Sequence, residues 1–147
     1  MNLDKLREEI AADEGVKLEI YLDHLGLPTV GIGHLIRDND PEHGCDVGTP
    51  ITEDRMKELF DNDVQSVLDD CVKLYPDFYD LPEEVQLIVA NMMFNMGYTR
   101  LSKFKMMKAA VDGGDFKEAS VQMADSAWAR QVPNRANRLI ARMESVA

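Results

Sequence analysis

The sequence lacks the marks of several protein classes. It holds two cysteines, Cys45 and Cys71, in 147 residues, which is too few for a disulfide scaffold and favours two free thiols. Its apolar runs are too short to span a bilayer, so we expect no membrane insertion. The charged N-terminus lacks the apolar stretch of a secretory signal. The sequence shows no four well-spaced metal ligands either, so we expect no metal and no other cofactor.

Basic charge is scarce in the first two thirds of the chain. Residues 1–100 contain 8 Lys and Arg against 22 Asp and Glu, whereas residues 101–147 contain 8 against 5. The net charge of the whole chain is −11. Because nucleic acids attract basic surfaces, this balance argues against a nucleic-acid partner.

The length suits one domain, residues 1–147, built as two lobes. Apolar periodicity and turn residues predict a helix to about residue 13, short strands in 17–34, a loop over 37–50, a long helix over 52–75, a helix over 82–96 and three shorter helices at 101–112, 115–127 and 134–145. This pattern predicts an α+β fold. A small N-terminal β-hairpin lobe, about 13–51, is joined by the helix 52–75 to a mainly helical lobe formed by 1–12 and 76–147.

Local signals predict where several of these elements begin and end. Asn2 can cap the first helix and Gly15 can end it. Gly26 and Pro28 mark the turn between strands, and Pro82 suits the first turn of a helix. The segment 83–96 is apolar nearly all round, which is typical of a buried helix. Asp115 with Glu118 three residues later resembles a capping box.

Three residues near the start of the chain suggest a chemistry. Glu14 follows the first helical pattern, Asp23 lies in the predicted hairpin, and Thr29 comes just before a glycine-punctuated strand that ends in His34. Two carboxyl groups in unlike environments, brought together by a turn, are what cleavage of a glycosidic bond needs. Each has a plainer interpretation as well: a solvent-exposed acid, a turn aspartate and a packed strand residue.

The motif closely resembles the phage-type lysozymes of glycoside hydrolase family 24, and the T-even phage endolysins in particular. The residues that carry the resemblance are Asp13-Glu14-Gly15, Ile20-Tyr21, Asp23, Thr29 and Gly31-Ile32-Gly33-His34. It extends through 51–63, 91–97 and 126–138, and so covers most of the chain. The resemblance implies a lysozyme-like fold and a muramidase that hydrolyses the β-1,4 bond between N-acetylmuramic acid and N-acetylglucosamine in peptidoglycan.

The resemblance also implies residue roles. Glu14 would be the general acid, with Asp23 and Thr29 completing the catalytic set of an inverting mechanism. Leu35, Phe94, Met107 and Gln122 would occupy the saccharide-binding positions. Met107 and Gln122 stand where the family commonly has Ser and Asn, and core packing is an equal alternative for Phe94 and Met107.

Four residues would support the site. By resemblance His34 pairs with Asp63, and we expect this pair to raise the pKa of His34. Arg135 could pair with Glu14, and Tyr21 would line the site. Trp128 could stack on a sugar, although its spacing favours a place in the core.

The biological setting follows from the resemblance alone. A monomeric endolysin would stay in the host cytoplasm until holin-type release lets it reach the glycan strands of the wall. A virion-borne wall-piercing lysozyme, a chitinolytic enzyme, a non-catalytic wall-binding protein and a helical interaction module are the alternatives.

Overall fold

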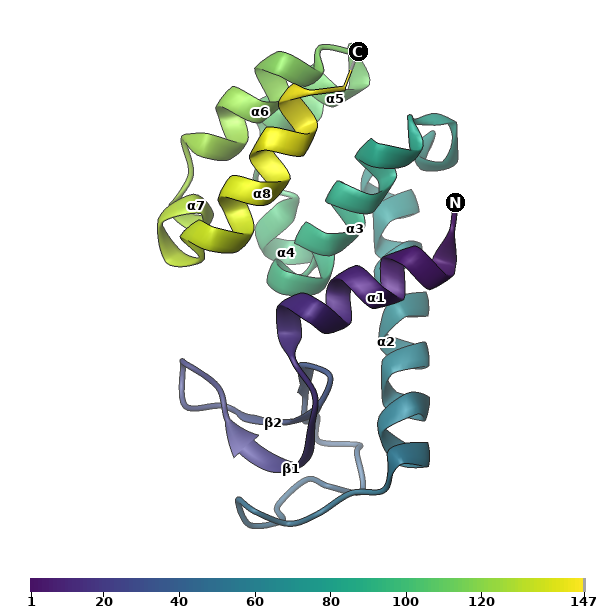
Figure 1. The fold of residues 1–147 in the computed structure, drawn as a ribbon, viewed down its shortest axis with the longest axis vertical. Helices are drawn as coiled ribbons and strands as arrows, with labels where there is room; N and C mark the ends of the chain where they lie inside the picture. The colour runs from purple at the N-terminus through teal and green to yellow at the C-terminus, as the bar shows by residue number, and fades with distance from the viewer. Residues whose placement is uncertain (147) are drawn as a thin grey trace. The chain divides into compact units, whose positions relative to one another are not determined.

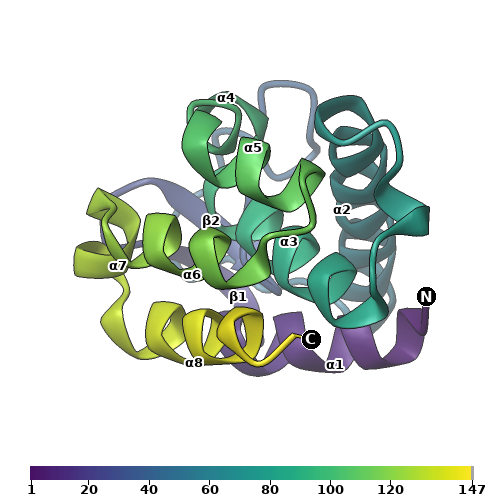
Figure 2. The ribbon, with the colours of Figure 1, turned by 90° about the horizontal axis from the view of Figure 1, so that it is seen from above.

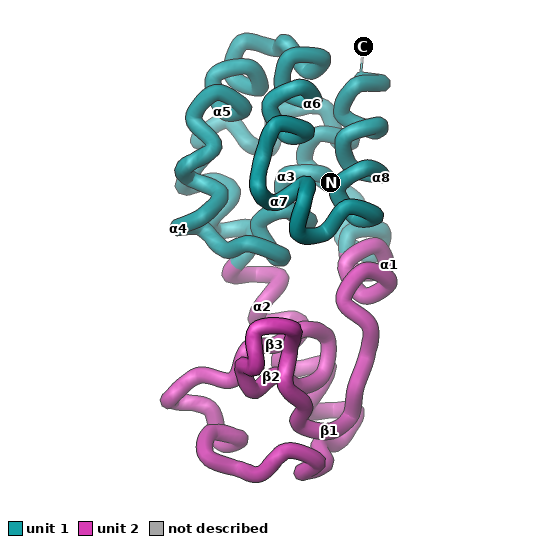
Figure 3. Tube along the Cα trace, turned by 90° about the vertical axis from the view of Figure 1, so that its left-hand side faces the viewer, with its two compact units in different colours: residues 1–6, 67–147 teal, residues 7–66 magenta. Residues whose placement is uncertain are grey.

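The computed structural model describes residues 1–146 and confirms an α+β, lysozyme-like architecture (Figure 1). Over those residues it contains eight α-helices, one 3-10 helix and a three-stranded antiparallel sheet. The chain divides into two compact units (Figure 3). We call residues 7–66 the β unit, and residues 1–6 with the chain from Val67 onward the helical unit. The boundaries fall within α1 and α2.

The β unit holds the sheet, most of α1 (Leu3–Glu14) and the first part of α2 (Glu53–Leu74). The strands are β1 (Lys17–Leu22), β2 (Pro28–Gly31) and β3 (His34–Leu35), in the order β1-β2-β3. Two register pairs matter for the site: Tyr21 lies opposite Thr29, and Val30 lies opposite His34. Consecutive elements therefore carry Glu14, Asp23, Thr29 and His34 within one unit.

Side-chain caps begin both helices of the β unit, and the sequence predicts the one at Asn2. Asn2 Oδ1 accepts the N–H of Lys5 over 3.1 Å at the start of α1. Gly15, with φ of +76°, follows its last residue. Thr52 Oγ1 accepts the N–H of Arg55 over 3.1 Å at the start of α2. Such caps satisfy N–H groups that have no partner inside the helix.

A small apolar core holds the sheet against α2. It consists of Ile20, Val30 and Leu59, with Ile36 and Ile51 partly buried against it. Residues 37–50 are an irregular loop, as predicted. The loop returns alongside β1, where Ile20 N–H donates to Thr49 O over 2.9 Å. The loop therefore covers the edge of β1 that does not pair with β2.

The helical unit surrounds one buried helix. Its elements are η1 (Phe78–Asp80), α3 (Glu83–Met96), α4 (Tyr98–Leu101), α5 (Lys105–Asp112), α6 (Phe116–Ala124), α7 (Ala127–Gln131) and α8 (Pro133–Glu144). Figure 2 shows α3 beside α8, and these two helices are in contact. Every residue of α3 from Val85 to Met93 is buried, which confirms the prediction from its all-round apolar sequence.

Some predicted element bounds were wrong. Three short helices were expected over 101–145, but the chain forms five from Tyr98 to Glu144, because a turn at 102–104 separates α4 from α5 and Ser126 caps the start of α7. Pro82 precedes α3 instead of lying in its first turn, and Pro28 belongs to β2 instead of the turn. The predicted cap at Asp115 is confirmed, since its Oδ1 accepts the N–H of Glu118 over 3.1 Å.

Among residues 1–146, no helix combines the length and the apolar composition that a membrane crossing needs.

Candidate active site

Glu14 is the last residue of α1 and packs directly on Gly33. A Cβ atom placed on Gly33 would lie 2.6 Å from Glu14 Oε1 and 3.0 Å from its Cδ. Gly33 also has φ of +61°, a conformation that other residues rarely adopt. A side chain on Gly33 would overlap the position of the Glu14 carboxyl group, so the glycine between β2 and β3 leaves the space that this group occupies.

Asp23 follows β1 and anchors the hairpin turn. Its Oδ1 accepts the N–H groups of Leu25, over 2.8 Å, and Leu27, over 2.9 Å. The sequence left a turn role and a catalytic role open, and the structure shows the turn role. The two roles are compatible, because the backbone donors bind only one of the two carboxylate oxygens.

Thr29 is buried on β2, with 4% of its surface exposed. Its Oγ1 donates to the carbonyl oxygen of Leu27 over 3.0 Å. Tyr21 lies opposite it on β1 and is half-buried, and Lys17 Nζ lies 4.4 Å from the centre of its ring. The pKa of Tyr21 is raised, first by burial and then by the negative charges of Glu14 and Asp23. Because the charges of Glu14 and Asp23 both act on the Tyr21 phenol, the two carboxylates lie in the same part of the β unit.

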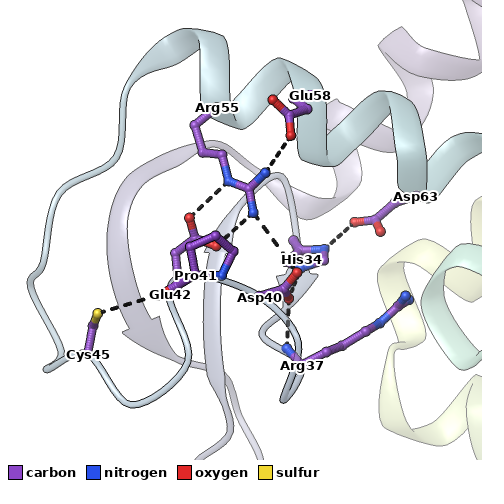
Figure 4. Close-up of polar contacts among 9 residues, drawn as sticks. All are labelled: His34, Arg37, Asp40, Pro41, Glu42, Cys45, Arg55, Glu58 and Asp63. Atoms are coloured by element: carbon purple, nitrogen blue, oxygen red, sulfur yellow. Dashed lines mark hydrogen bonds and ion pairs between the residues drawn. The ribbon is translucent and has the colours of Figure 1, made fainter.

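His34 is held between two carboxylates (Figure 4). Its Nδ1 lies 2.6 Å from Asp63 Oδ2, on α2, which confirms the predicted pair. Its Nε2 lies 2.7 Å from Asp40 Oδ2, a second partner that the sequence analysis missed. Burial alone would lower the pKa of His34, but the hydrogen bonds and charges of Asp63 and Asp40 raise it overall, as expected.

Arg55 on α2 extends this cluster to the loop 37–50. It binds Glu42 through two nitrogen–oxygen bonds of 2.9 Å and Glu58 through one of 2.7 Å (Figure 4). The Arg55 bond lowers the pKa of Glu42 despite its burial. Burial of Asp40 opposes ionisation, yet the N–H of Arg37 and the imidazole of His34 lower its pKa. The loop is therefore pinned to α2 by charge-assisted bonds.

The predicted saccharide-binding residues occupy different environments. Leu35 is on β3 in the β unit and is 47% exposed. In the helical unit Phe94 is half-buried, and Gln122 Nε2 donates to Glu118 Oε1 over 2.8 Å. Met107 is buried, with 1% of its surface exposed, as the packing interpretation expects. A sugar-binding role for any of the four stays a prediction.

Arg135 and Trp128 are fixed inside the helical unit. Arg135 is buried, and its Nε donates to Asn91 Oδ1 over 2.8 Å. Its pairing with Glu14 stays a prediction. Trp128 is buried as its spacing favours, and its indole N–H donates to Asn95 Oδ1 over 2.7 Å. Both asparagines belong to the segment 91–97 that carries the resemblance.

The described part of the chain offers no candidate metal site. Within residues 1–146, no group of three or more His, Cys, Asp or Glu side chains could hold a metal ion. Cys45 is exposed and Cys71 is buried, and both are free thiols.

Comparisons with known proteins find relatives that match most of this chain. The chain is 29% identical over 162 residues to "Probable T4-type lysozyme 2" of Dictyostelium discoideum, covering 97% of this chain and 95% of that protein. It is 27% identical to "Pre-baseplate central spike protein Gp5" of Enterobacteria phage T4, covering 91% of this chain and 26% of that one. It is 28% identical to "Peptidoglycan hydrolase gp36" of Pseudomonas phage phiKMV, covering 93% of this chain and 15% of that one.

The match to a protein family spans nearly the whole chain. Residues 11–145 match the family described as Phage lysozyme, a range that includes Glu14, the hairpin and every helix of the helical unit after α2. The chain therefore belongs to the phage lysozyme family.

Proposed function

We propose that the chain hydrolyses the β-1,4 glycosidic bond between N-acetylmuramic acid and N-acetylglucosamine in peptidoglycan, with Glu14 as the general acid. The observation that carries the proposal is the seat of the Glu14 carboxyl group on Gly33, in the same unit as Asp23 and Thr29. The name of one relative, a peptidoglycan hydrolase, supports the substrate.

Glu14 supplies the proton that the leaving sugar needs. A glycoside departs poorly as an alkoxide, so the bridging oxygen must be protonated as the bond breaks. A general acid has to be held in one place relative to that oxygen, because a small displacement costs much of the rate. In this structure the Glu14 carboxyl group occupies the space left by the absent side chain of Gly33.

Asp23 and Thr29 orient the attacking water in the proposed mechanism. Asp23 offers a carboxylate that stabilises positive charge at the sugar carbon and takes part in activating the water. Thr29 offers a hydroxyl oxygen beside it on the next strand. We propose that the reaction inverts the anomeric carbon, which requires the carboxyl groups of Glu14 and Asp23 to lie about 6.5–9.5 Å apart.

The biological role we propose is lysis of a bacterial host by a monomeric enzyme that reaches the wall through holin-type release. The relatives include a virion spike protein, so a virion-borne lysozyme is the second setting to test. Lysis timing in an infected culture with the gene deleted separates them: an endolysin mutant assembles infectious particles that stay inside the cells.

The test of the chemistry is a peptidoglycan assay with a matched pair of variants. Glu14→Gln removes the acid but keeps the shape of the side chain. Glu8→Gln makes the same change at an exposed position of α1 and is the control. We expect the parent and Glu8→Gln to clear a wall suspension and Glu14→Gln to fail. Clearing by Glu14→Gln at the parent's rate would overturn the proposal.

A further inference from the structure

One residue of the hairpin turn bonds to both Asp23 and Thr29. The N–H of Leu27 donates to Asp23 Oδ1 over 2.9 Å. The carbonyl oxygen of Leu27 accepts the Thr29 hydroxyl over 3.0 Å, and the N–H of Asp23 over 3.0 Å as well. The peptide groups of Leu27 therefore hold the carboxylate and the hydroxyl in one frame.

These bonds decide what each side chain can still do. The Thr29 hydroxyl has a single proton, and that proton is directed at Leu27. Towards a water molecule, Thr29 Oγ1 can therefore only accept a hydrogen bond. Asp23 Oδ1 already accepts two N–H groups, so Oδ2 is the oxygen that can face the same water. A water that donates one proton to each oxygen keeps a lone pair for attack.

The turn depends on a left-handed residue next to Leu27. Gly26 has φ of +77°, and its N–H donates to Asp23 O over 2.9 Å. Gly26 is the last residue of the four-residue turn that begins at Asp23, and a left-handed glycine is common at this place in a hairpin. A Cβ atom on Gly26 would meet no atom within 4 Å, so a side chain there would disturb the backbone conformation alone.

We propose that Gly26 is a positioning residue of the reaction: its left-handed conformation aims the Leu27 peptide groups at Asp23 and Thr29. This inference rests on the proposed function of those two side chains. Gly26 would not touch the substrate. It would act through Leu27, by keeping Asp23 Oδ2 and Thr29 Oγ1 at a fixed spacing around the water.

The experiment compares Gly26→Ala with Gly44→Ala. Gly44 lies in the loop 37–50, has φ of +82° and would likewise place a Cβ in open space. The two substitutions therefore impose similar backbone strain in the same unit, one at the proposed site and one away from it. A third variant, Gly26→Asn, supplies a residue that tolerates the left-handed conformation better than alanine.

Two readouts are measured on all variants. Steady-state kinetics on soluble peptidoglycan fragments should show kcat of Gly26→Ala lower by about 10- to 100-fold with KM nearly unchanged, and Gly26→Asn should recover most of it. Gly44→Ala should keep the parent's kcat. Amide hydrogen exchange at Leu27 should be faster in Gly26→Ala than in Gly44→Ala at equal global stability.

The outcomes separate this inference from the proposed function. Equal kcat in Gly26→Ala and Gly44→Ala would overturn the inference, and so would unchanged exchange at Leu27. A parent that cleaves no peptidoglycan while Leu27 exchange responds as expected would sink the proposed function and leave the anchoring of Asp23 by the turn standing. Faster exchange without loss of kcat would show that the anchor exists and that the reaction does not depend on it.

Discussion

Replacing His34 by glutamine should destabilise the fold most at mildly acidic pH. The imidazole is 4% exposed and bonds at 2.6 Å and 2.7 Å to the carboxylates of Asp63 and Asp40. A hydrogen bond to a charged group contributes about 1.5–3 kcal/mol, so the two contribute about 3–6 kcal/mol. Glutamine can replace about one of these hydrogen bonds, so the unfolding free energy should fall by about 2–3 kcal/mol at pH 5.5.

The sign of the pH dependence follows from the raised pKa of His34, whose ordinary value is 6.5. A group with a raised folded pKa contributes stability that is fully present below its unfolded pKa and lost as pH rises through its folded pKa. The pKa of Asp40 is lowered, so its contribution is lost only as pH falls through that lowered value. The difference in unfolding free energy between the parent and His34→Gln should therefore be large at pH 5.5 and smaller at pH 9.

Urea unfolding at the two pH values, followed by circular dichroism, measures this gap. His43→Gln is the control, because the exposed His43 side chain pairs with the exposed Asp38, at 3.2 Å. Exposed ion pairs contribute little to stability, so the control should unfold like the parent. Equal losses in the two variants, or a gap that widens towards pH 9, would refute the reasoning.

Three further predictions concern single positions. Gly33→Ala should reduce kcat by about 10²-fold, because the added Cβ would displace the Glu14 carboxyl group. Wall-clearing kinetics with the kcat and KM of the parent would contradict this prediction. In the native protein a thiol reagent should label Cys45 alone, because burial raises the pKa of the Cys71 thiol; two thiols counted without denaturant would be the contrary result. Trp128→Phe removes a buried indole hydrogen bond and should lower the unfolding free energy by about 1–3 kcal/mol in a urea titration. An unchanged unfolding free energy would show that this bond contributes nothing to stability.

Sequence-based prediction worked where local chemistry decides the structure. The caps at Asn2 and Asp115 each depend on one side chain and the backbone three residues away, so the local sequence is sufficient to predict them. The burial of α3 follows in the same way from an apolar pattern that leaves no polar face.

That the candidate residues lie in one unit was predictable, because they are close along the chain. Only 15 positions separate Glu14 from Thr29, and one turn brings them into the same unit. The seat of Glu14 on Gly33 was not predicted. It depends on how the end of α1 meets the β2–β3 connection, which no local pattern reports.

The ion network around His34 shows where sequence reasoning ends. Asp63 was expected from the family resemblance, but Asp40 was not, since the loop 37–50 offers several acidic residues with no pattern to distinguish them. Arg55 reaches Glu42 across 13 positions, a contact set by the path of that loop. The breaks between the short helices were not predicted for another reason. Neither the segment 102–104 nor Ser126 contains the glycine or proline that usually marks a helix end.

The most direct test of the central claim is digestion of purified peptidoglycan in water enriched in oxygen-18, with the products read by mass spectrometry. If Glu14 and Asp23 carry out hydrolysis, each new muramic acid reducing end gains one heavy oxygen and Glu14→Gln yields no such product. Products that are lighter by one water and carry no label, or cuts in the peptide stems, would contradict a hydrolytic muramidase.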